Sequence, residues 1–355
     1  MASAVFVHAQ WSAPPLHGNR DRQAVVFNRK SVIVSSTSQR FPGIFRRFPL
    51  PTRSCGFVLG AQKRGNGGAA VNPKENQLAR IALQSSLWAA EAAYILWLFL
   101  LPYAPGDPVW AINSNTVNDL VGLSLNFFFV LPLANLGKLM GYLEAMQFIS
   151  FDFSLKVVGL HVIQAPVLHP MAEGLFNFVI GWTFLFAPLL FTDRRRGRFK
   201  GSLDLLWGFQ MFLTNTFLIP YMAIRLNNMS SDADQPPPKP SKLGLLMTNG
   251  ARPVGLIGGI VCFVSVIWAL FGRADSDFGD FANRWQFLEL YIQSERLAYA
   301  FIWDIFLYAI FQPWLIGDNL QNVKISDKEL VSVLRYIPVL GLVAYLLCLD
   351  SELDL

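Results

Sequence analysis

The sequence has few charged residues: Asp, Glu, Lys and Arg make up 15% of its 355 residues, whereas about 25% is usual in soluble domains. Hydrophobic residues supply 53% of the chain, among them 30 Phe and 10 Trp. The apolar residues fall in blocks of about twenty, the length that a helix needs to cross a hydrocarbon core about 30 Å thick. This composition excludes an ordinary soluble protein and predicts a membrane protein.

Cysteine is equally scarce, and the three present have neither metal-binding nor redox spacing: Cys55, Cys262 and Cys348. That scarcity excludes iron–sulfur and zinc sites built from cysteine. The chain also lacks a Gly-rich phosphate loop, a Ser/His/Asp arrangement and a cysteine nucleophile. We therefore find no catalytic signature and no indicated cofactor, although a bound pigment or lipid is compatible with the composition.

Histidine offers one cluster with metal-binding chemistry, made of His161, His169 and Glu173. His169 and Glu173 are spaced i, i+4 around Pro170, a pattern that favours a capped helix start over a ligand set. Tetrahedral and facial-triad metal sites need at least three protein ligands. We predict no metal site.

Acidic residues are nearly missing from residues 1–70, which hold ten Lys or Arg and only Asp21. This segment is rich in hydroxyl residues (31–38) and lacks the apolar core of a secretory signal. We predict a disordered, removable chloroplast transit peptide over 1–65 and a linker over 66–80. A mitochondrial leader has a similar composition, but arginines beside Phe-Pro pairs favour the plastid. Residues 71–355 carry a net charge of −4, so no nucleic-acid partner is predicted.

The remaining chain predicts an all-α, polytopic transmembrane helix bundle with six or seven spans. A Pro-rich exposed linker over 227–250 separates an N-terminal transmembrane half (81–226) from a C-terminal half (251–355). If seven spans alternate, Lys and Arg divide ten against eight between the two sides, which leaves the orientation open. The predicted segments are Ile81–Ala104, Val117–Leu136, Gly174–Phe191, Leu203–Ile224, Pro253–Gly272, Leu297–Ile316 and Leu330–Leu349.

Three of these regions depart from a plain span. The second segment contains Asn118, Asp119 and Asn126, so a shorter or re-entrant course is an alternative there. Residues 137–173 are polar with interspersed Phe and predict an interfacial amphipathic helix. Pro338 and Gly341 predict a kink in the last segment.

The third and sixth segments end on a shared pattern, F-x-P-x-L-x-x-D, at an offset of 125 residues. At the same offset the fourth segment aligns closely with the seventh. A repeat of three spans would place its halves inverted in the membrane, a plan common among transporters. Chance similarity between two apolar helix ends is the alternative. The motif residues are Pro188, Asp193, Pro313 and Asp318.

Polar residues inside the predicted spans are the candidates for chemistry. Asp304 lies eight residues into the sixth span, where insertion of a charge costs at least about 2.5–3.5 kcal/mol. Glu91 lies midway along the first span among small residues. We expect Asp304 to pair with Glu91, Asn126 or Asn177 on other spans, either to join helices or to bind a proton, a cation or a polar ligand group.

Residues 294–306 and 188–195 resemble segments of small membrane proteins of plastids and cyanobacteria. Residues 294–306 are similar to a helix of the family that contains the plastid protein required for neoxanthin formation, in which an acidic residue follows small and aromatic residues. The likeness covers about a tenth of the chain. It implies a plastid membrane address and draws attention to Asp304.

Three functions follow as hypotheses. The first is an integral protein of the thylakoid or inner envelope that binds an apolar partner, namely a lipid, an isoprenoid pigment or another membrane protein, and supports assembly or maintenance of photosynthetic membranes. The second is an ion or small-solute transporter with inverted three-helix halves that uses Asp304 and Glu91. The third is a membrane enzyme of carotenoid or isoprenoid metabolism.

Overall fold

The computed structural model describes residues 73–132, 166–227, 240–273 and 278–350, all within one compact unit formed by residues 67–355. The regular secondary structure of these residues is helical, with one isolated bridge between Val323 and Leu349. The all-α prediction is therefore confirmed. The predicted transit peptide (1–65) and most of the predicted interfacial segment (137–173) lie outside the described residues.

Four helices are long and apolar enough to cross a membrane, judged by length and composition. The first is α1 (Pro73–Ile95) together with the π-helical turn η1 (Leu96–Leu100). The others are α5 (Pro170–Phe191), α9 (Ala251–Phe271) and α11 (Arg296–Asp318). Helix α5 is the central one, since 83% of its apolar window is buried, against 17% in the first helix.

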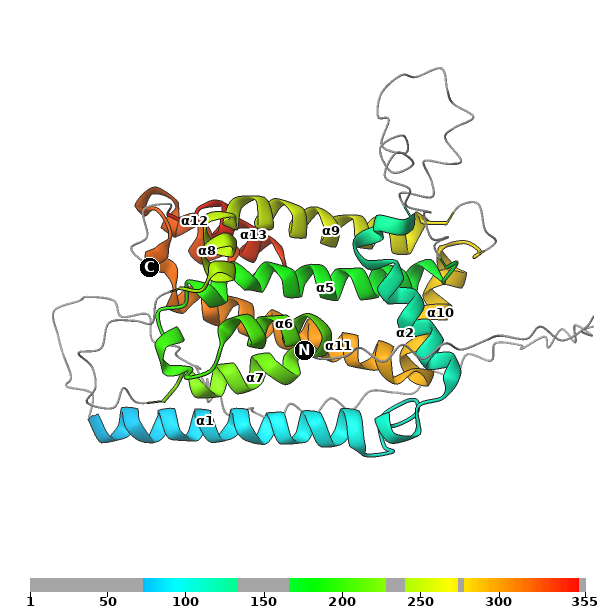
Figure 1. Ribbon diagram of the computed structural model, residues 1–355, viewed down its shortest axis with the longest axis horizontal. Coiled ribbons are helices and arrows are strands. Elements are labelled where there is room, and N and C mark those ends of the chain that lie inside the picture. Colours follow the sequence, from blue (N-terminus) through cyan, green and yellow to red (C-terminus); the bar gives the residue numbers. More distant parts are fainter. Residues whose placement is uncertain (1–72, 133–165, 228–239, 274–277, 351–355) are drawn as a thin grey trace, which may run out of the picture. The chain divides into compact units, whose positions relative to one another are not determined.

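Helices α5 and α9 pack antiparallel along their whole length, held close by glycine (Figure 1). A methyl group at Gly174 would lie 2.7 Å from the Cβ of Ala269, and one at Gly258 would lie 2.6 Å from Leu185. Between them, Gly181 adjoins Cys262. Small residues at such contacts let two backbones approach, which is how helices associate in lipid.

Helices α5 and α11 instead lie side by side in the same direction and in register. The rings of Phe176 and Phe301 are 5.9 Å apart, and the hydroxyls of Thr183 and Tyr308 are 2.6 Å apart. Each pair is separated by 125 residues, so the offset stays constant along the contact. We call the end of the bundle at which α5 and α11 finish the Asp193 end, and the end at which they begin the Glu173 end.

The fourth predicted span, Leu203–Ile224, is not one helix but a hairpin. Helix α6 (Leu203–Leu213) and helix α7 (Asn215–Ile224) meet at Thr214, where φ is 41° and ψ is −112°. Phe209 and Phe217 stack across the turn with centroids 5.3 Å apart, and α7 returns to the end of α5. At 1.5 Å per residue each arm is about 15 Å long, about half of a 30 Å hydrocarbon core.

The seventh predicted span, Leu330–Leu349, is a second hairpin, made of α12 (Lys328–Leu334) and α13 (Leu340–Leu347). The predicted break at Pro338 is present, and the next residue, Val339, has φ 63°. Its ends also lie at the Asp193 end, where Asn322 donates a hydrogen bond to the Thr192 carbonyl (2.8 Å). Both hairpins therefore enter from one end of the bundle and leave by the same end.

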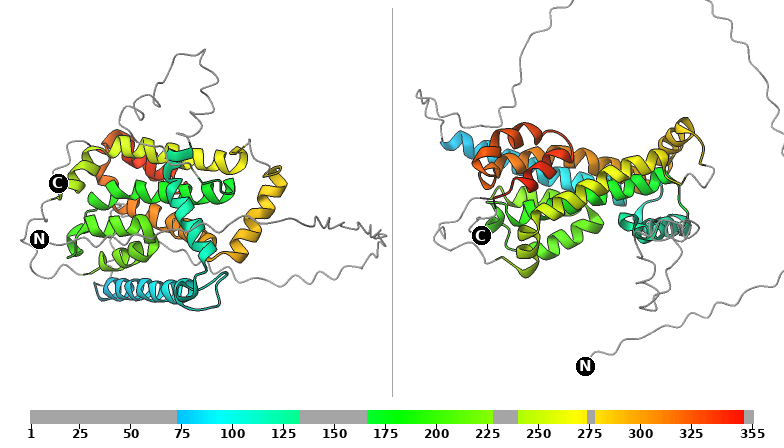
Figure 2. Two further views of the ribbon diagram at one scale, coloured as in Figure 1. Left: turned by 45° about the vertical axis from the view of Figure 1, so that its right-hand side comes forward. Right: turned by 90° about the horizontal axis from the view of Figure 1, so that it is seen from above.

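The second predicted span, Val117–Leu136, is also not a crossing helix as far as it is described. Helix α2 (Ser114–Leu125) has 12 residues and runs across the long helices rather than along them (Figures 1 and 2). It ends at Asn126, after which η3 (Phe127–Phe129) turns with Phe128 at φ 52°. The polar residues noted in the sequence lie in and after this short helix.

Two further helices connect these elements. Within the linker predicted to be extended (227–250), Lys242–Asn249 forms α8, capped by Ser241 and packed on α5 and α9. Helix α10 (Phe281–Ser294) precedes α11 at the Glu173 end and is capped by Asp280. Four single 3₁₀ turns complete the described fold: η2 (Val109–Ala111), η5 (Arg196–Arg198), η6 (Leu320–Asn322) and η7 (Ile325–Asp327).

The parallel course of α5 and α11 corrects the expectation of inverted halves. Between these two helices the chain forms the α6–α7 hairpin, which returns to its starting end, and then α9, which runs to the other end. Since the hairpin adds no net crossing, α11 begins where α5 began. The inverted arrangement would have required a full span over residues 203–224.

Candidate functional site

Four carboxylates of the described chain are buried, and three of them, Glu173, Asp193 and Asp304, accept side-chain hydrogen bonds from other elements; the fourth, Glu91, is described below. A buried ionised carboxylate is costly unless a charge partner and hydrogen bonds compensate for the lost water. The hydrogen-bond and charge partners of each carboxylate therefore show whether it stabilises the fold or is available to bind a ligand.

Asp193, the motif residue that follows α5, is fully compensated. Arg225 binds it in a two-pronged pair, with Nε to Oδ2 at 2.9 Å and Nη2 to Oδ1 at 2.8 Å. Tyr221 donates to Oδ2 (2.6 Å) and Asn319 donates to Oδ1 (3.0 Å). Burial by itself would raise the pKa of Asp193, but the bonds and charge of Arg225 outweigh it and the pKa lies below its ordinary value.

Asp318, the equivalent motif residue at the end of α11, binds the same arginine. Its Oδ2 accepts a bond from Arg225 Nη1 at 2.9 Å, and Arg195 lies 3.5 Å away. Pro188 and Pro313 lie inside the last turns of α5 and α11, just before these acids. The motif residues thus meet at one end of the bundle, where two acids share Arg225 in an ion-paired joint.

Glu173 is compensated in the same way near the start of α5. Arg273 donates to it twice, from Nη2 to Oε1 at 2.5 Å and from Nε to Oε2 at 3.2 Å. Trp268 Nε1 adds a bond of 2.7 Å, and Asn126 Nδ2 adds one of 2.6 Å. This joint ties α5, α9 and the end of α2 together.

Asn126 and Asn177, which we expected beside Asp304, belong to this Glu173 joint instead. Asn177 accepts a bond from the Phe128 amide (2.6 Å) and donates one to the Asn126 carbonyl (3.2 Å). The two amides therefore fix the irregular backbone after α2. This placement corrects the predicted pairing.

His169 confirms the expectation of a helix cap. Its Nδ1 accepts a bond from the Met171 amide (3.2 Å), and its ring stacks on Phe287 with centroids 3.5 Å apart. Burial, followed by the charge of Arg284, lowers the pKa of His169 to about 4, so the imidazole is neutral at pH 7. Within the described ranges no three of His, Cys, Asp and Glu gather as a metal site.

Asp304 differs from the other two carboxylates because its partners are all neutral. Tyr94 Oη donates to Oδ1 at 2.8 Å, and Asn215 Nδ2 donates to the same oxygen at 2.7 Å. Thr214 lies beside them. Among the described residues no Lys, Arg or His forms an ion pair or hydrogen bond with Asp304, which is 1% exposed.

The position of Asp304 explains part of its environment. It lies in α11 opposite the tip of the α6–α7 hairpin, so the first turn of α7 begins beside it. A helix amino terminus carries roughly half a positive charge. That partial charge stabilises a carboxylate but is smaller than its full negative charge. A proton or a cation would neutralise the rest of the charge on Asp304.

Polar atoms without partners gather around the same hairpin. Gln210 Nε2 and Oε1, Asn215 Oδ1, Thr216 Oγ1 and Trp207 Nε1 are all buried and form no hydrogen bond within the described chain. Each unsatisfied buried group costs about 1–3 kcal/mol. Such a cluster in a native protein indicates water or a ligand.

Glu91, the other acidic candidate, does not contact Asp304. It lies one helical turn before Tyr94 on α1, 6% exposed, and its Oε2 has no partner in the described part of the chain. Leu87, Glu91, Tyr94 and Leu98 form one buried face of α1, and this 4–3–4 spacing was visible in the sequence. That face could have marked Tyr94, which our sequence reading missed.

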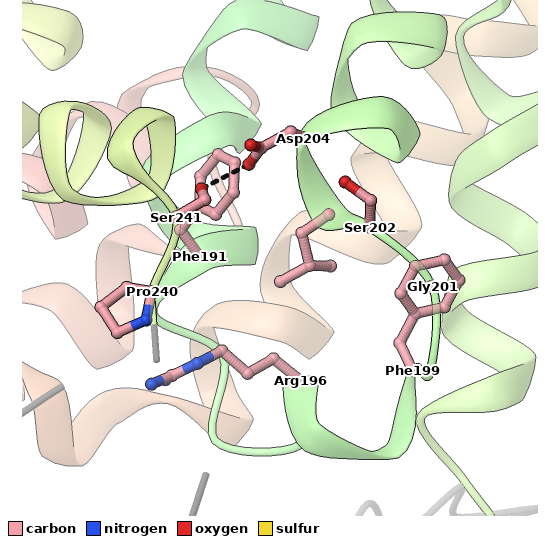
Figure 3. Close-up of a pocket in the computed structure, with 9 residues that line it drawn as sticks. Phe191, Arg196, Phe199, Gly201, Ser202, Asp204, Pro240 and Ser241 are labelled. Atoms are coloured by element: carbon pink, nitrogen blue, oxygen red, sulfur yellow. Dashed lines mark hydrogen bonds between the residues drawn. The ribbon is translucent and has the colours of Figure 1, made fainter. Parts of the chain in front are cut away.

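A cavity of about 170 Å³ opens at the Asp193 end, at the start of α6 (Figure 3). Phe191, Phe199 and Leu203 supply its apolar wall, while Arg196 and Asp204 supply charge. Asp204 accepts a hydrogen bond of 2.5 Å from Ser241, which precedes α8.

Comparison with known proteins identifies no relative. No known protein family matches the chain, and no characterised protein or solved structure is significantly similar to it.

Proposed function

We propose that the chain is an integral membrane carrier that binds a monovalent cation, the proton or Na⁺, at Asp304. One observation carries this proposal: of the three buried carboxylates that accept side-chain hydrogen bonds, Asp193 and Glu173 each hold an arginine, whereas Asp304 has only neutral donors. An intramembrane acid that lacks a countercharge is expected to take up a cation.

The groups around Asp304 suit such a ligand. Tyr94 and Asn215 both donate to Oδ1, so we place the proton or the metal cation at Oδ2, beside Thr214. Tyr94, Thr214 and Asn215 place further neutral oxygens around the carboxylate, and hard cations prefer oxygen ligands. Both forms of the proposal share one chemistry, which is neutralisation of the carboxylate by a small cation.

A parallel repeat, which we infer over α5–α7 and α11–α13, also supports a carrier. The breaks at Thr214 and Val339 are 125 residues apart, as are the starts of α7 and α13. Asp304 belongs to the second unit and its partner Asn215 to the first, while Tyr94 comes from α1, which precedes both. Carriers commonly bind their coupling ion between repeats and beside interrupted helices.

We infer four crossings and two re-entrant hairpins in place of six or seven spans. With this topology the basic residues fall on one side: twelve of the fifteen described Lys and Arg residues after position 76 lie at the Asp193 end, against Arg273, Arg284 and Arg296 at the other. The positive-inside rule then places the Asp193 end on the side of insertion, the stroma if the plastid prediction is right.

Plastid location, photosynthetic membrane assembly and isoprenoid metabolism stay predictions from the sequence. The apolar faces that α1 and α9 expose are what a lipid-facing helix requires. They do not point to a particular pigment or protein. The Asp304 centre is a more specific feature, which is why we place transport first.

Flux in proteoliposomes tests the proposal. We expect purified protein to support either proton flux driven by a K⁺ diffusion potential or ²²Na⁺ uptake driven by a pH gradient. Asp304→Asn, which keeps the shape and removes the charge, should reduce that flux at least about tenfold, a barrier increase of about 1.4 kcal/mol. The proton arm and the Na⁺ arm identify the ion.

Asp318→Asn is the matched control, because it removes a carboxylate from the same helix but not from the centre. Its flux should stay within about twofold of the wild type. Flux no greater than in empty liposomes, or equal flux in the wild type and Asp304→Asn in both arms, would contradict the carrier.

A further inference from the structure

We propose that a water-accessible path runs along α6 from the cavity at its amino end to Asp304, so that the centre exchanges with the Asp193 end alone. The inference deepens the proposed cation site, and its meaning for transport rests on that function. Its structural basis is the row of buried polar groups on α6 and α11.

The first element of the path is one face of α6. Leu203, Trp207, Gln210 and Thr214 are spaced four, three and four residues apart, which places them on one side of a helix. Leu203 lines the cavity, and Thr214 lies beside Asp304. Between them, the indole N–H of Trp207 and both amide atoms of Gln210 are buried without partners in the described structure.

The second element is the facing side of α11 and α5. Tyr308 lies one turn beyond Asp304 toward the Asp193 end, with its hydroxyl 2.6 Å from that of Thr183. Gln210 approaches the Tyr308 hydroxyl but forms no hydrogen bond with it. A polar group thus occurs at each turn between Asp304 and the cavity, and water molecules bridging them would satisfy the unpartnered atoms.

The mouth of the path suits a cation. Asp204, in the first turn of α6, lines the cavity together with Ser202 and Ser241 (Figure 3). Arg196 lies on the opposite wall and leaves the cavity close to neutral. An entrance of this kind admits hydrated ions without holding an anion.

Toward the Glu173 end the described part of the chain is closed. Ala298 and Phe301, the turns of α11 before Asp304, are buried and apolar. Arg296 seals the start of α11 by donating to carbonyl oxygens of the chain that follows α1, including those of Leu101 (2.8 Å) and Ala104 (2.9 Å). Within the described residues, hydrogen bonds fill this end and leave no matching route.

The second hairpin provides an internal contrast. Gln312 of α11 faces the tip of this hairpin and is fully bonded. Its Oε1 accepts from Trp182 (3.0 Å) and from the Val339 amide (3.1 Å), and its Nε2 donates to the carbonyls of Arg335 and Ile337 (both 2.9 Å). The two hairpins share their shape, but the described α12–α13 hairpin has a single unpartnered buried atom, Arg335 Nε, whereas α6–α7 has five. The path is therefore specific to the first hairpin.

Cysteine labelling tests the path without requiring transport. In a chain with Cys55, Cys262 and Cys348 replaced by Ala, we would introduce Gln210→Cys and, as a nearly isosteric second position, Thr216→Cys. A small cationic, membrane-impermeant methanethiosulfonate is the probe. Phe212→Cys is the control because Phe212 lies on the same hairpin but is 84% exposed on the outer surface.

We expect modification at positions 210 and 216 from the Asp193 end at least about tenfold faster than at position 212, with Lys200→Cys reporting access to that end. Equal, slow modification at all three positions while Lys200→Cys reacts would overturn the path. So would faster labelling of position 210 from the end marked by Trp110→Cys. Labelling at positions 210 and 216 without any ion flux would support the path and contradict the carrier function. The two proposals can therefore be contradicted separately.

Discussion

Arg225 is the residue on which the two motif acids converge, and the acids differ in exposure. The Arg225 and Asp193 side chains are 0% exposed, whereas the Asp318 side chain is 27% exposed. Removing one partner of a buried ion pair strands the other charge and costs about 3–5 kcal/mol. A partly exposed pair contributes about 1 kcal/mol or less.

We therefore predict that Asp193→Asn lowers the free energy of unfolding in detergent by about 3–5 kcal/mol, and that Asp318→Asn lowers it by about 1 kcal/mol or less. Thermal unfolding followed by circular dichroism measures both. Similar losses in the two variants would show that the joint is not organised around Asp193.

The Asp193 carboxylate also limits the stability of the protein at acid pH. Its folded pKa lies below the ordinary 3.8, so its stabilising effect is complete above about pH 4 and is lost as pH falls through the folded pKa. Asp193→Asn should consequently lose less stability than the wild type between pH 4 and pH 2. An unchanged acid profile in the variant would contradict the assignment.

At the scale of helices, the α5–α9 contact depends on the absence of side chains. A Cβ at Gly258 would lie 2.6 Å from Leu185, whereas one at Gly208 on α6 meets nothing within 4 Å. Overpacking of a close contact costs about 1–3 kcal/mol, while Gly→Ala in an open helical site gains about 0.5–1 kcal/mol.

We predict that Gly258→Val lowers the melting temperature and that the control Gly208→Ala preserves or raises it. Differential scanning fluorimetry in detergent is sufficient to measure both. If Gly258→Val were as stable as the wild type, α5 and α9 would have to pack more loosely than described.

Length and hydropathy did not distinguish the two hairpins from single transmembrane spans. Residues 203–224 have the length and hydropathy of a span, and a helical hairpin buried against its neighbours has the same composition. Pro338 predicted the break in the helix at the second hairpin, and that prediction is confirmed. In the first hairpin the signal was the polar run Thr214-Asn215-Thr216, the only such run in that segment, which our sequence reading passed over.

At the scale of the molecule, two membrane topologies can be distinguished by the side on which particular residues lie. If seven spans alternate, Lys200 and Lys242 lie on opposite sides of the membrane. With a re-entrant α6–α7 hairpin they lie on the same side.

We predict that Lys200→Cys and Lys242→Cys, each in the cysteine-free chain, react with an impermeant thiol reagent from one side of sealed vesicles. Trp110→Cys, 71% exposed near the Glu173 end, should react only from the other side. Reaction of positions 200 and 242 from opposite sides would restore the alternating topology.

The sequence by itself determined the helical class and the apolar character and drew attention to Asp304, because length and hydropathy are local properties of a segment. It predicted six or seven spans, and the described structure has four helices long enough to cross a membrane. The sequence also contained the 125-residue offset. Only the tertiary structure decided that α5 and α11 are parallel, that Asn126 and Asn177 bind at Glu173, and that Asp304 is bonded by Tyr94 and Asn215 rather than by the residues expected from the sequence. These features depend on which side chains meet across distant segments, and the direction of the halves depended on a single turn at Thr214.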